Sequence, residues 1–144
     1  MIDTQGRVLL IHERYELNGQ PRDHWLTPGG GVEAGEDPRE SAVREAYEET
    51  GITLHLAPDA PEILTTRRLW SWRELHFDQT DHFFCARVPA GVPVHPRGLT
   101  EVEMSTLLGH RWWTVDELRA TDATVLPPQL ADVLAALLAQ PVTG

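Results

Sequence analysis

Apolar and polar residues alternate along several stretches of the chain, a pattern that favours β-strands. Residues 7–12 (RVLLIH) form an apolar run that predicts a strand. The next segment, residues 13–24, is polar and carries a turn signal at Asn18-Gly19. Residues 25–27 predict a short strand that leads into a run of glycines.

A helix is predicted for residues 38–50, because both of its ends carry clear signals. Asp37 is a good N-cap, and Pro38 suits the first helical position, where its missing N–H costs nothing. Glu40 follows Asp37 by three residues, which is close to a capping box. Gly51 directly after the helix supplies a left-handed C-cap.

The remainder of the chain predicts further strands, loops and short helices. We expect strands at residues 52–56, 63–72, 73–88 (with a break at 78–81) and 111–114, loops at 57–61 and 89–100, and helices at 115–120 and 130–138. Strands interspersed with two or three helices indicate an α/β or α+β fold. The 144 residues fit a single domain, residues 1–144, with a core of its own.

One side of the helix at residues 38–50 is strongly charged. At about 100° per residue, five residues fall within roughly 140° of arc: Ser41, Arg44, Glu45, Glu48 and Glu49. We expect the opposite, apolar side to be buried and the charged side to face a cleft or water. Like charges on one helix face repel each other. Either this face is well solvated, with Arg44 pairing along the helix, or a cation neutralises it.

Two features favour the cation. The glycines before the helix make a tight loop whose backbone N–H and C=O groups are free to meet a ligand or an ion. Glu33 and Glu36 lie in or just after this loop, so that their carboxylates add to those of the helix. Because all of these candidate ligands are oxygens, we expect a hard cation, Mg²⁺ or Mn²⁺, rather than zinc.

The segment from Gly30 to Ile52 resembles the Nudix box of the Nudix hydrolases, G-x5-E-x7-R-E-U-x-E-E-x-G-U, in which U is apolar. Every fixed position of the pattern is filled in this chain at the correct spacing. The resemblance implies an enzyme that hydrolyses a nucleoside diphosphate linked to another moiety. It also implies a Nudix-like α/β/α sandwich with a mixed central sheet.

The resemblance assigns roles to the matching residues. The carboxylates that match the family's metal ligands are Glu45, Glu48 and Glu49. Gly30 is expected to offer its carbonyl, Glu36 to support the metal site, and Arg44 to orient a glutamate of the box. Metal ions that bridge phosphate oxygens would neutralise the charge that repels an attacking hydroxide. Water would then attack phosphorus, with a nucleotide or phosphate as the leaving group.

Several residues outside the box are candidates for the substrate site. Many Nudix enzymes place a catalytic base in a loop outside the box, and we expect Glu103, or else Glu101, to take that role. Arg67 and Arg68 lie on a predicted strand where one of them could contact phosphate. The aromatic residues that could stack on a nucleobase are Trp70, Trp72, Phe77 and Tyr15.

Bulk properties agree with a small cytoplasmic enzyme. No apolar run is long enough to cross a bilayer, and the N-terminus shows no signal peptide. Cys85 is the only cysteine, so no intrachain disulfide can form, which suits the cytosol. The net charge of −10 argues against a groove that tracks nucleic-acid phosphates, but not against a small phosphorylated ligand bound through metal ions.

The start of the chain predicts an unusual sheet edge. In Nudix domains a full strand normally precedes the segment that matches residues 3–10, whereas only Met1-Ile2 precede it here. Either the domain begins with a shortened edge strand or the true start lies upstream. A missing strand would expose an unpaired edge that another chain could cover, and this makes a homodimer an expectation.

Two classes of function remain open from the sequence. The first is a Mg²⁺-dependent pyrophosphohydrolase, whose substrate could be a nucleoside triphosphate, a nucleotide sugar, ADP-ribose or a dinucleoside polyphosphate. The second is a non-catalytic nucleotide-binding sensor that keeps the fold. Such sensors usually lose box carboxylates, whereas this chain has all of them. A nucleic-acid-binding module is disfavoured by the net charge.

Overall fold

The apolar run near the N-terminus becomes the central strand of a mixed sheet. The computed structural model describes residues 1–72 and 74–140, without the side chain of Trp72. The stacking role expected of Trp72 and the strand start expected at residue 73 therefore lie outside the described part. In the sheet, β2 (Val8–Leu17) pairs on one edge with both β1 (Ile2–Asp3) and β3 (Gln20–Leu26), and on the other edge with β7 (Leu107–Trp113).

Two short strands extend the sheet beyond β1 and β3. Strand β6 (Arg87–Val88) runs parallel to β1, and β8 (Val125–Leu126) runs parallel to β3, whereas the pairs formed by β2 are antiparallel. The expectation of a mixed sheet is confirmed. Because β1 lies between β6 and β2, the unpaired edge on which the homodimer rested is covered at this position. The homodimer itself stays a prediction.

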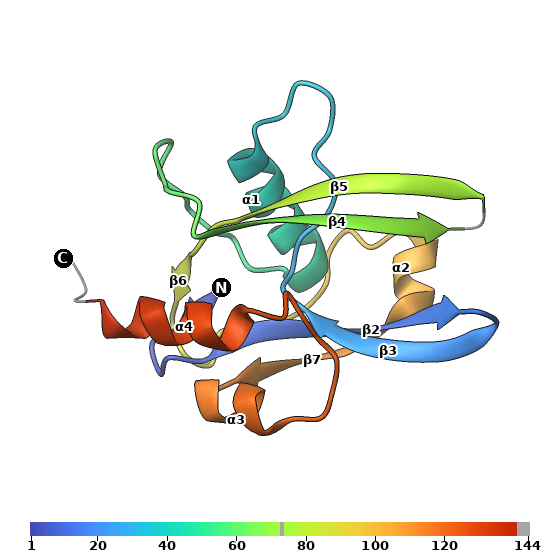
Figure 1. Cartoon of the computed structure of the whole chain (residues 1–144). Coiled ribbons are helices and arrows are strands. Elements are labelled where there is room, and N and C mark those ends of the chain that lie inside the picture. The colour runs from blue at the N-terminus through green and yellow to red at the C-terminus, as the bar shows by residue number, and fades with distance from the viewer. Residues whose placement is uncertain (73, 141–144) are drawn as a thin grey trace.

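Helices cover both faces of the sheet (Figure 1), as the α/β/α sandwich requires. Alternate residues of β2 point to opposite faces. Val8 and Leu10 are buried with side chains of α3 (Val115–Ala120) and α4 (Leu130–Ala139), among them Leu134. Leu9 is buried with Ala46 of α1 (Pro38–Thr50). Within the described residues, no helix is long and apolar enough to cross a membrane.

Strands β4 (Leu64–Trp72) and β5 (Leu75–Phe83) form a separate two-stranded sheet, which Figure 1 shows as a ribbon alongside the main sheet. The break expected at residues 78–81 was wrong, since β5 runs through it without interruption. Polar residues are tolerated there because they pair across the ribbon: Arg67 Nε donates to Asp78 Oδ1 over 2.6 Å, and Arg68 Nε donates to Asp81 Oδ2 over 2.7 Å.

The polar segment at residues 13–24 is a β-hairpin, so the strand expected at residues 7–12 was too short. Asn18 and Gly19 have φ values of 52° and 73°, the left-handed conformations of a two-residue hairpin turn. The far half of the hairpin is exposed and polar because it extends past the core. The apolar pattern therefore marks the buried half of β2 and not the length of the strand.

The strand expected at residues 52–56 was wrong, although its alternation is real. Ile52 and Leu54 are buried and Thr53 and His55 are exposed, yet no strand is present at residues 51–57. The same alternation arises in a loop that packs one side against the core. Two further bounds shift: β7 begins at Leu107 rather than at 111, and Glu101 and Glu103 lie in a short helix, α2 (Glu101–Thr106), instead of a loop.

The ends of α1 agree with the sequence prediction. Asp37 Oδ1 accepts from the backbone N–H of Arg39 over 2.8 Å, and Glu40 Oε2 accepts from the N–H of Asp37 over 3.2 Å, which completes a capping box. Gly51 has a φ of 70°, and its N–H donates to the carbonyl of Tyr47. These caps fix where the charged face of α1 begins and ends.

Asp3 is a fully buried carboxylate at the turn between β1 and β2. Its Oδ1 accepts from the backbone N–H groups of Gln5 and Arg7, each over 2.9 Å, and its Oδ2 accepts from Arg7 Nε over 2.8 Å. Burial raises the pKa of Asp3, but these hydrogen bonds and the charge of Arg7 outweigh it and hold the pKa below its usual value.

We expect Asp3→Asn to lower the free energy of unfolding at pH 7 by about 3 kcal/mol, because a buried ion pair loses one partner. The pKa of Asp3 is lower in the folded chain than the ordinary value of about 3.9. Its stabilisation is therefore present above that ordinary value and is lost as the pH falls through the folded-state pKa. Urea unfolding should show a smaller deficit at pH 3 than at pH 7.

The matched control is Asp59→Asn, in the exposed turn at residues 57–60, which should change the free energy of unfolding little at either pH. A deficit for Asp3→Asn that is the same at both pH values would contradict the role given to the charge of Asp3.

Candidate active site

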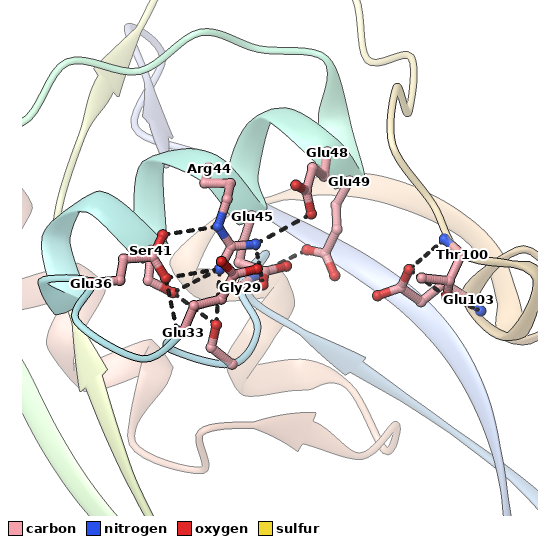
Figure 2. A network of polar contacts seen from close by, with 11 residues as sticks. Gly29, Glu33, Glu36, Ser41, Arg44, Glu45, Glu48, Glu49, Thr100 and Glu103 are labelled. Atoms are coloured by element: carbon pink, nitrogen blue, oxygen red, sulfur yellow. Dashed lines mark hydrogen bonds and ion pairs between the residues drawn. The ribbon is translucent and has the colours of Figure 1, made fainter.

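Arg44 ties the glycine loop to helix α1 (Figure 2). Its Nε and Nη2 donate to the two carboxylate oxygens of Glu36 over 2.9 and 3.0 Å, and Nη2 also donates to the carbonyl of Gly31 over 2.9 Å. These bonds from Arg44, together with one from the backbone N–H of Glu33, lower the pKa of Glu36 to about 2. Glu36 therefore stays ionised and fixes the guanidinium of Arg44 in the loop.

The same guanidinium reaches two carboxylates of the helix. Arg44 Nη1 lies 2.8 Å from Glu45 Oε1 and 3.4 Å from Glu48 Oε2. The pairing of Arg44 with Glu48 expected from the sequence is present, but the bond to Glu45 is the shorter one. Arg44 thus orients several glutamates of the box at once.

Gly30 allows the loop to lie directly against Glu45. A Cβ atom at Gly30 would overlap the carboxyl group of Glu45, so no other residue fits here without displacing that side chain. Glu45 is only 8% exposed, and its burial raises its pKa against the opposing effect of Arg44. The backbone of Gly30 and the carboxylate of Glu45 are therefore immediate neighbours.

Glu49 is the most perturbed carboxyl group of the site. It is 9% exposed, and its Oε2 accepts from the backbone N–H of Gly29 over 2.9 Å. Burial raises the pKa of Glu49 to about 8, and the nearby charges of Glu13, Glu45 and Glu103 act in the same direction. An ionised Glu49 is thus unfavourable in the protein alone, and a bound cation would remove that cost.

The burial of α1 differs from the expectation that its apolar side alone is covered. On the polar side, Ser41, Glu45 and Glu49 are buried, whereas Tyr47 on the opposite side is 45% exposed. The helix therefore packs its carboxylates inward, under the glycine loop. Helical periodicity could not show this, because it gives the relative positions of side chains and not the element that covers them.

The donor set fits a hard divalent cation. Among the described residues, no group of three or more acidic, histidine or cysteine side chains already converges as a metal site. Instead, Arg44 holds Glu36, Glu45 and Glu48, and Gly29 holds Glu49. The available donors are nevertheless all oxygens, two of the carboxylates are buried, and the exposed Gly30 lies beside Glu45.

Glu103 approaches the site from α2, and Figure 2 shows its side chain and that of Glu49 pointing toward one another. The charge of Glu103 raises the pKa of both Glu45 and Glu49. One oxygen of Glu103 caps α2, where it accepts from the N–H and the hydroxyl of Thr100, each over 2.7 Å. Glu101 is exposed at the first position of the same helix. Of the two base candidates, Glu103 is therefore the one near the carboxylates.

Two residues of the hairpin were missed by the sequence reasoning. Glu13 on β2 contributes to the raised pKa of Glu49, and its Oε2 lies 3.6 Å from Nε2 of His24 on β3. Tyr15 stacks on His24 with ring centroids 4.7 Å apart. The missing signal was the hairpin itself: once β2 is extended, residues 9, 11, 13 and 15 share the face of the sheet that α1 covers.

A cavity of about 1060 Å³ lies between the glycine loop, the β4–β5 ribbon and α4, and the carboxylates of α1 are not part of its lining. Glu13, His24, Arg67, Arg68 and Phe77 line it together with residues 29–32. Arg67 and Arg68 are engaged by Asp78 and Asp81, as described above. Trp70 is outside this lining: it is 42% exposed and stacks on Phe77 at 4.2 Å. Tyr15, 36% exposed, reaches the cavity only through its contact with His24.

Comparison with known proteins agrees with the pattern of the box. A family model described as the NUDIX domain matches residues 1–137. An RNA pyrophosphohydrolase of Roseobacter denitrificans is 42% identical over an alignment of 82 residues, which covers 54% of this chain and 44% of that protein. The chain thus spans less than half the length of this curated relative.

Solved structures extend the similarity to the fold. A NUDIX hydrolase from Nitrosomonas europaea covers 96% of this chain and 84% of its own, with a TM-score of 0.63 at 24% identity. A C. elegans Ap4A hydrolase in a binary complex covers 92% of this chain and 85% of its own, with a TM-score of 0.58 at 19% identity. At these identities the likeness concerns the fold alone.

Proposed function

We infer the reaction of this chain from one premise: it belongs to the Nudix hydrolase family. Enzymes of this family hydrolyse a nucleoside diphosphate linked to another moiety. We propose that this chain hydrolyses a phosphoanhydride bond of such a substrate, with Mg²⁺, or Mn²⁺ in its place, as the cofactor. The observation that carries the proposal is the pair of buried carboxylates, Glu45 and Glu49, held against the backbone of Gly29 and Gly30.

This proposal gives the residues of the site separate roles. Glu45, Glu48 and Glu49, with the carbonyl of Gly30, would hold the metal. A bound metal supplies neutralisation of the pyrophosphate charge and a water that ionises near neutral pH. Through the hydrogen bonds described above, Arg44 and Glu36 hold the glycine loop in a fixed position relative to the carboxylates of α1.

Glu103 is the proposed base. The oxygen of Glu103 that does not cap α2 would accept a proton from the attacking water. The water oxygen then bonds to phosphorus, and the bridging P–O bond breaks, with its electron pair leaving on the nucleotide or phosphate group. The leaving oxygen takes up a proton from solvent.

The cavity supports a small phosphorylated substrate. Arg67 and Arg68 are the proposed contacts for outer phosphates. Their guanidinium groups are bonded to Asp78 and Asp81, and a bound phosphate would compete with these carboxylates for them. Of the stacking candidates whose side chains the structure describes, Phe77 lines the cavity, whereas Tyr15 and Trp70 lie outside its lining and stay predictions. The relatives point to an RNA 5′ end and to a dinucleoside polyphosphate as substrates of those proteins. The net charge of −10 favours the small molecule over an extended RNA contact here.

The competing hypothesis is a sensor that binds a nucleotide without hydrolysing it. Intact box carboxylates weigh against it, because a sensor has no need of three acidic residues beside a phosphate. The test is a substrate panel of nucleoside triphosphates, nucleotide sugars, ADP-ribose, diadenosine tetraphosphate and a 5′-triphosphorylated RNA, with and without Mg²⁺. Products are identified by mass, and ¹⁸O from solvent locates the attacked phosphorus. Binding without Mg²⁺-dependent product release across the panel would favour the sensor.

We expect Glu103→Gln to lower kcat by about 10²-fold, because the water loses its proton acceptor. Glutamine can still cap α2 through its carbonyl oxygen, so the helix should persist. The matched control is Glu101→Gln, which changes the same helix at an exposed position and should leave kcat within about twofold of the wild type. Steady-state rates of both variants on the best panel substrate decide the matter. Equal losses in both, or a loss in Glu101→Gln alone, would be inconsistent with Glu103 as the base.

A further inference from the structure

A second cavity, of about 640 Å³, lies beside the loop that follows α1 and next to β6. Its charged and titratable lining residues are all basic: His55, Arg87, His95 and Arg97. No acidic residue is among the described residues that line it. We call it the basic pocket.

The charge of this lining is opposite in sign to the net charge of the chain. The sequence has 22 acidic and 12 Lys or Arg residues, and its net charge is −10. Two arginines and two histidines that share a concave surface without any acidic residue therefore make a local positive field within an acidic protein. Such a concave field attracts anions, and guanidinium groups bind phosphate oxygens bidentately.

The segment that carries two of these residues is fixed to the end of α1. The backbone N–H of His95 donates to the carbonyl of Thr50 over 2.7 Å, and that of Arg97 donates to the carbonyl of Glu48 over 2.8 Å. The carbonyls at the C-terminal end of α1 would otherwise repel an anion, and these bonds satisfy two of them. These bonds fix the positions of His95 and Arg97 through backbone groups alone, so they do not engage the side chains of the two residues.

The floor of the basic pocket is apolar. Ile52, Leu54 and Val88 line it and are buried. Arg87 pairs with Ile2 of β1 and donates from Nη2 to the carbonyl of Leu137 over 3.3 Å, so its guanidinium lies on the α4 face of the sheet and only Arg97 offers a guanidinium to this floor. A cationic rim over an apolar floor suits a ligand with an anionic end and an apolar body.

We propose that the basic pocket binds a small phosphate monoester with a ring or apolar group, of the size of a nucleoside monophosphate. The phosphate contacts Arg97, with His95 beside it at the rim, and the ring covers Leu54 and Val88. The volume lies in the range of small-molecule sites, roughly 300–1,000 Å³. The site goes beyond the proposed hydrolysis, and its lining shares only Leu54 with the larger cavity.

The experiment is an NMR titration of the ¹⁵N-labelled full chain with adenosine 5′-monophosphate, inorganic phosphate and adenosine. EDTA is present throughout, so that metal-dependent binding at the α1 carboxylates does not contribute. We expect amide shifts at His55, Val88, His95 and Arg97, and tighter binding of the monophosphate than of phosphate or adenosine alone. Arg97→Gln should weaken the monophosphate about tenfold, because one charged phosphate contact is lost.

Three further variants make the result decisive. Arg87→Gln should bind as the wild type does, because its guanidinium lies on the α4 face of the sheet. Arg22→Gln, at an exposed arginine of β3 outside both linings, and Glu49→Gln should both bind as the wild type does. Shifts confined to residues 29–31 and α1, unchanged affinity in Arg97→Gln, or stronger binding of single-stranded RNA through Arg97 would each overturn the proposal.

Discussion

Replacing Glu49 by glutamine is expected to lower kcat on the order of a thousandfold, since the substitution removes a buried charge from the proposed metal site. Glutamine keeps an oxygen that can accept from the N–H of Gly29, so the loop should stay in place. The measurement is steady-state hydrolysis of the best panel substrate at saturating Mg²⁺. The matched control is Glu40→Gln on the same helix, where glutamine preserves the capping box and full activity is expected.

The stability of Glu49→Gln shows whether its loss of turnover is a loss of fold. Because burial raises the pKa of Glu49 to about 8, its contribution to stability is full below the ordinary pKa of about 4.3. That contribution is lost as the pH rises through 8. In EDTA at pH 9, glutamine should therefore leave Tm unchanged or higher. Wild-type turnover in Glu49→Gln with every hydrolysed substrate would contradict the role assigned to Glu49.

Gly51→Ala is expected to cost the largest share of stability among single methyl additions. Gly51 has a φ of 70°, and a Cβ there would overlap the backbone carbonyl oxygen of His95. The left-handed conformation costs alanine about 1–2 kcal/mol, and relief of the overlap requires the segment that carries His95 to move. We expect a total loss of about 4 kcal/mol in urea unfolding.

The control for Gly51→Ala is Gly91→Ala, which has a similar φ of 78° but nothing within 4 Å of the added Cβ. It should show the conformational strain alone, about 1–2 kcal/mol. The difference between the two losses of unfolding free energy then measures the cost of the overlap between the added Cβ and the carbonyl oxygen of His95. Equal losses would mean that this contact adds nothing.

Sequence signals correctly predicted the parts of this fold that depend on interactions within a few residues. Both ends of α1 followed from Asp37, Glu40 and Gly51, because caps act within a few residues. The loop at residues 89–100 and the helix at residues 115–120 followed in the same way. The predictions that were wrong concern features that depend on residues distant in the sequence. Residues 52–56 alternate like a strand, but their alternation reflects packing against the core instead of pairing with a neighbour.

The candidate site shows the same division. The box residues follow from spacing along one loop and one helix, and the contacts of Arg44 with Glu36, Glu45 and Glu48 bring them together. Glu13 and His24 could not be found without the hairpin, since the place of Glu13 near Glu49 and its contact with His24 depend on the pairing of β2 with β3. The inward burial of Glu45 and Glu49 likewise depends on the glycine loop that folds over them.

The most direct test of the central claim is a titration with Mn²⁺ followed by electron paramagnetic resonance, in the presence of a non-hydrolysable nucleotide. The account predicts saturable binding by the wild type, displacement by Mg²⁺, and at least tenfold weaker binding in Glu45→Gln and Glu49→Gln, with Glu40→Gln as the unaffected control. A wild type that leaves Mn²⁺ free at millimolar protein, or equal affinity in all three variants, would contradict it.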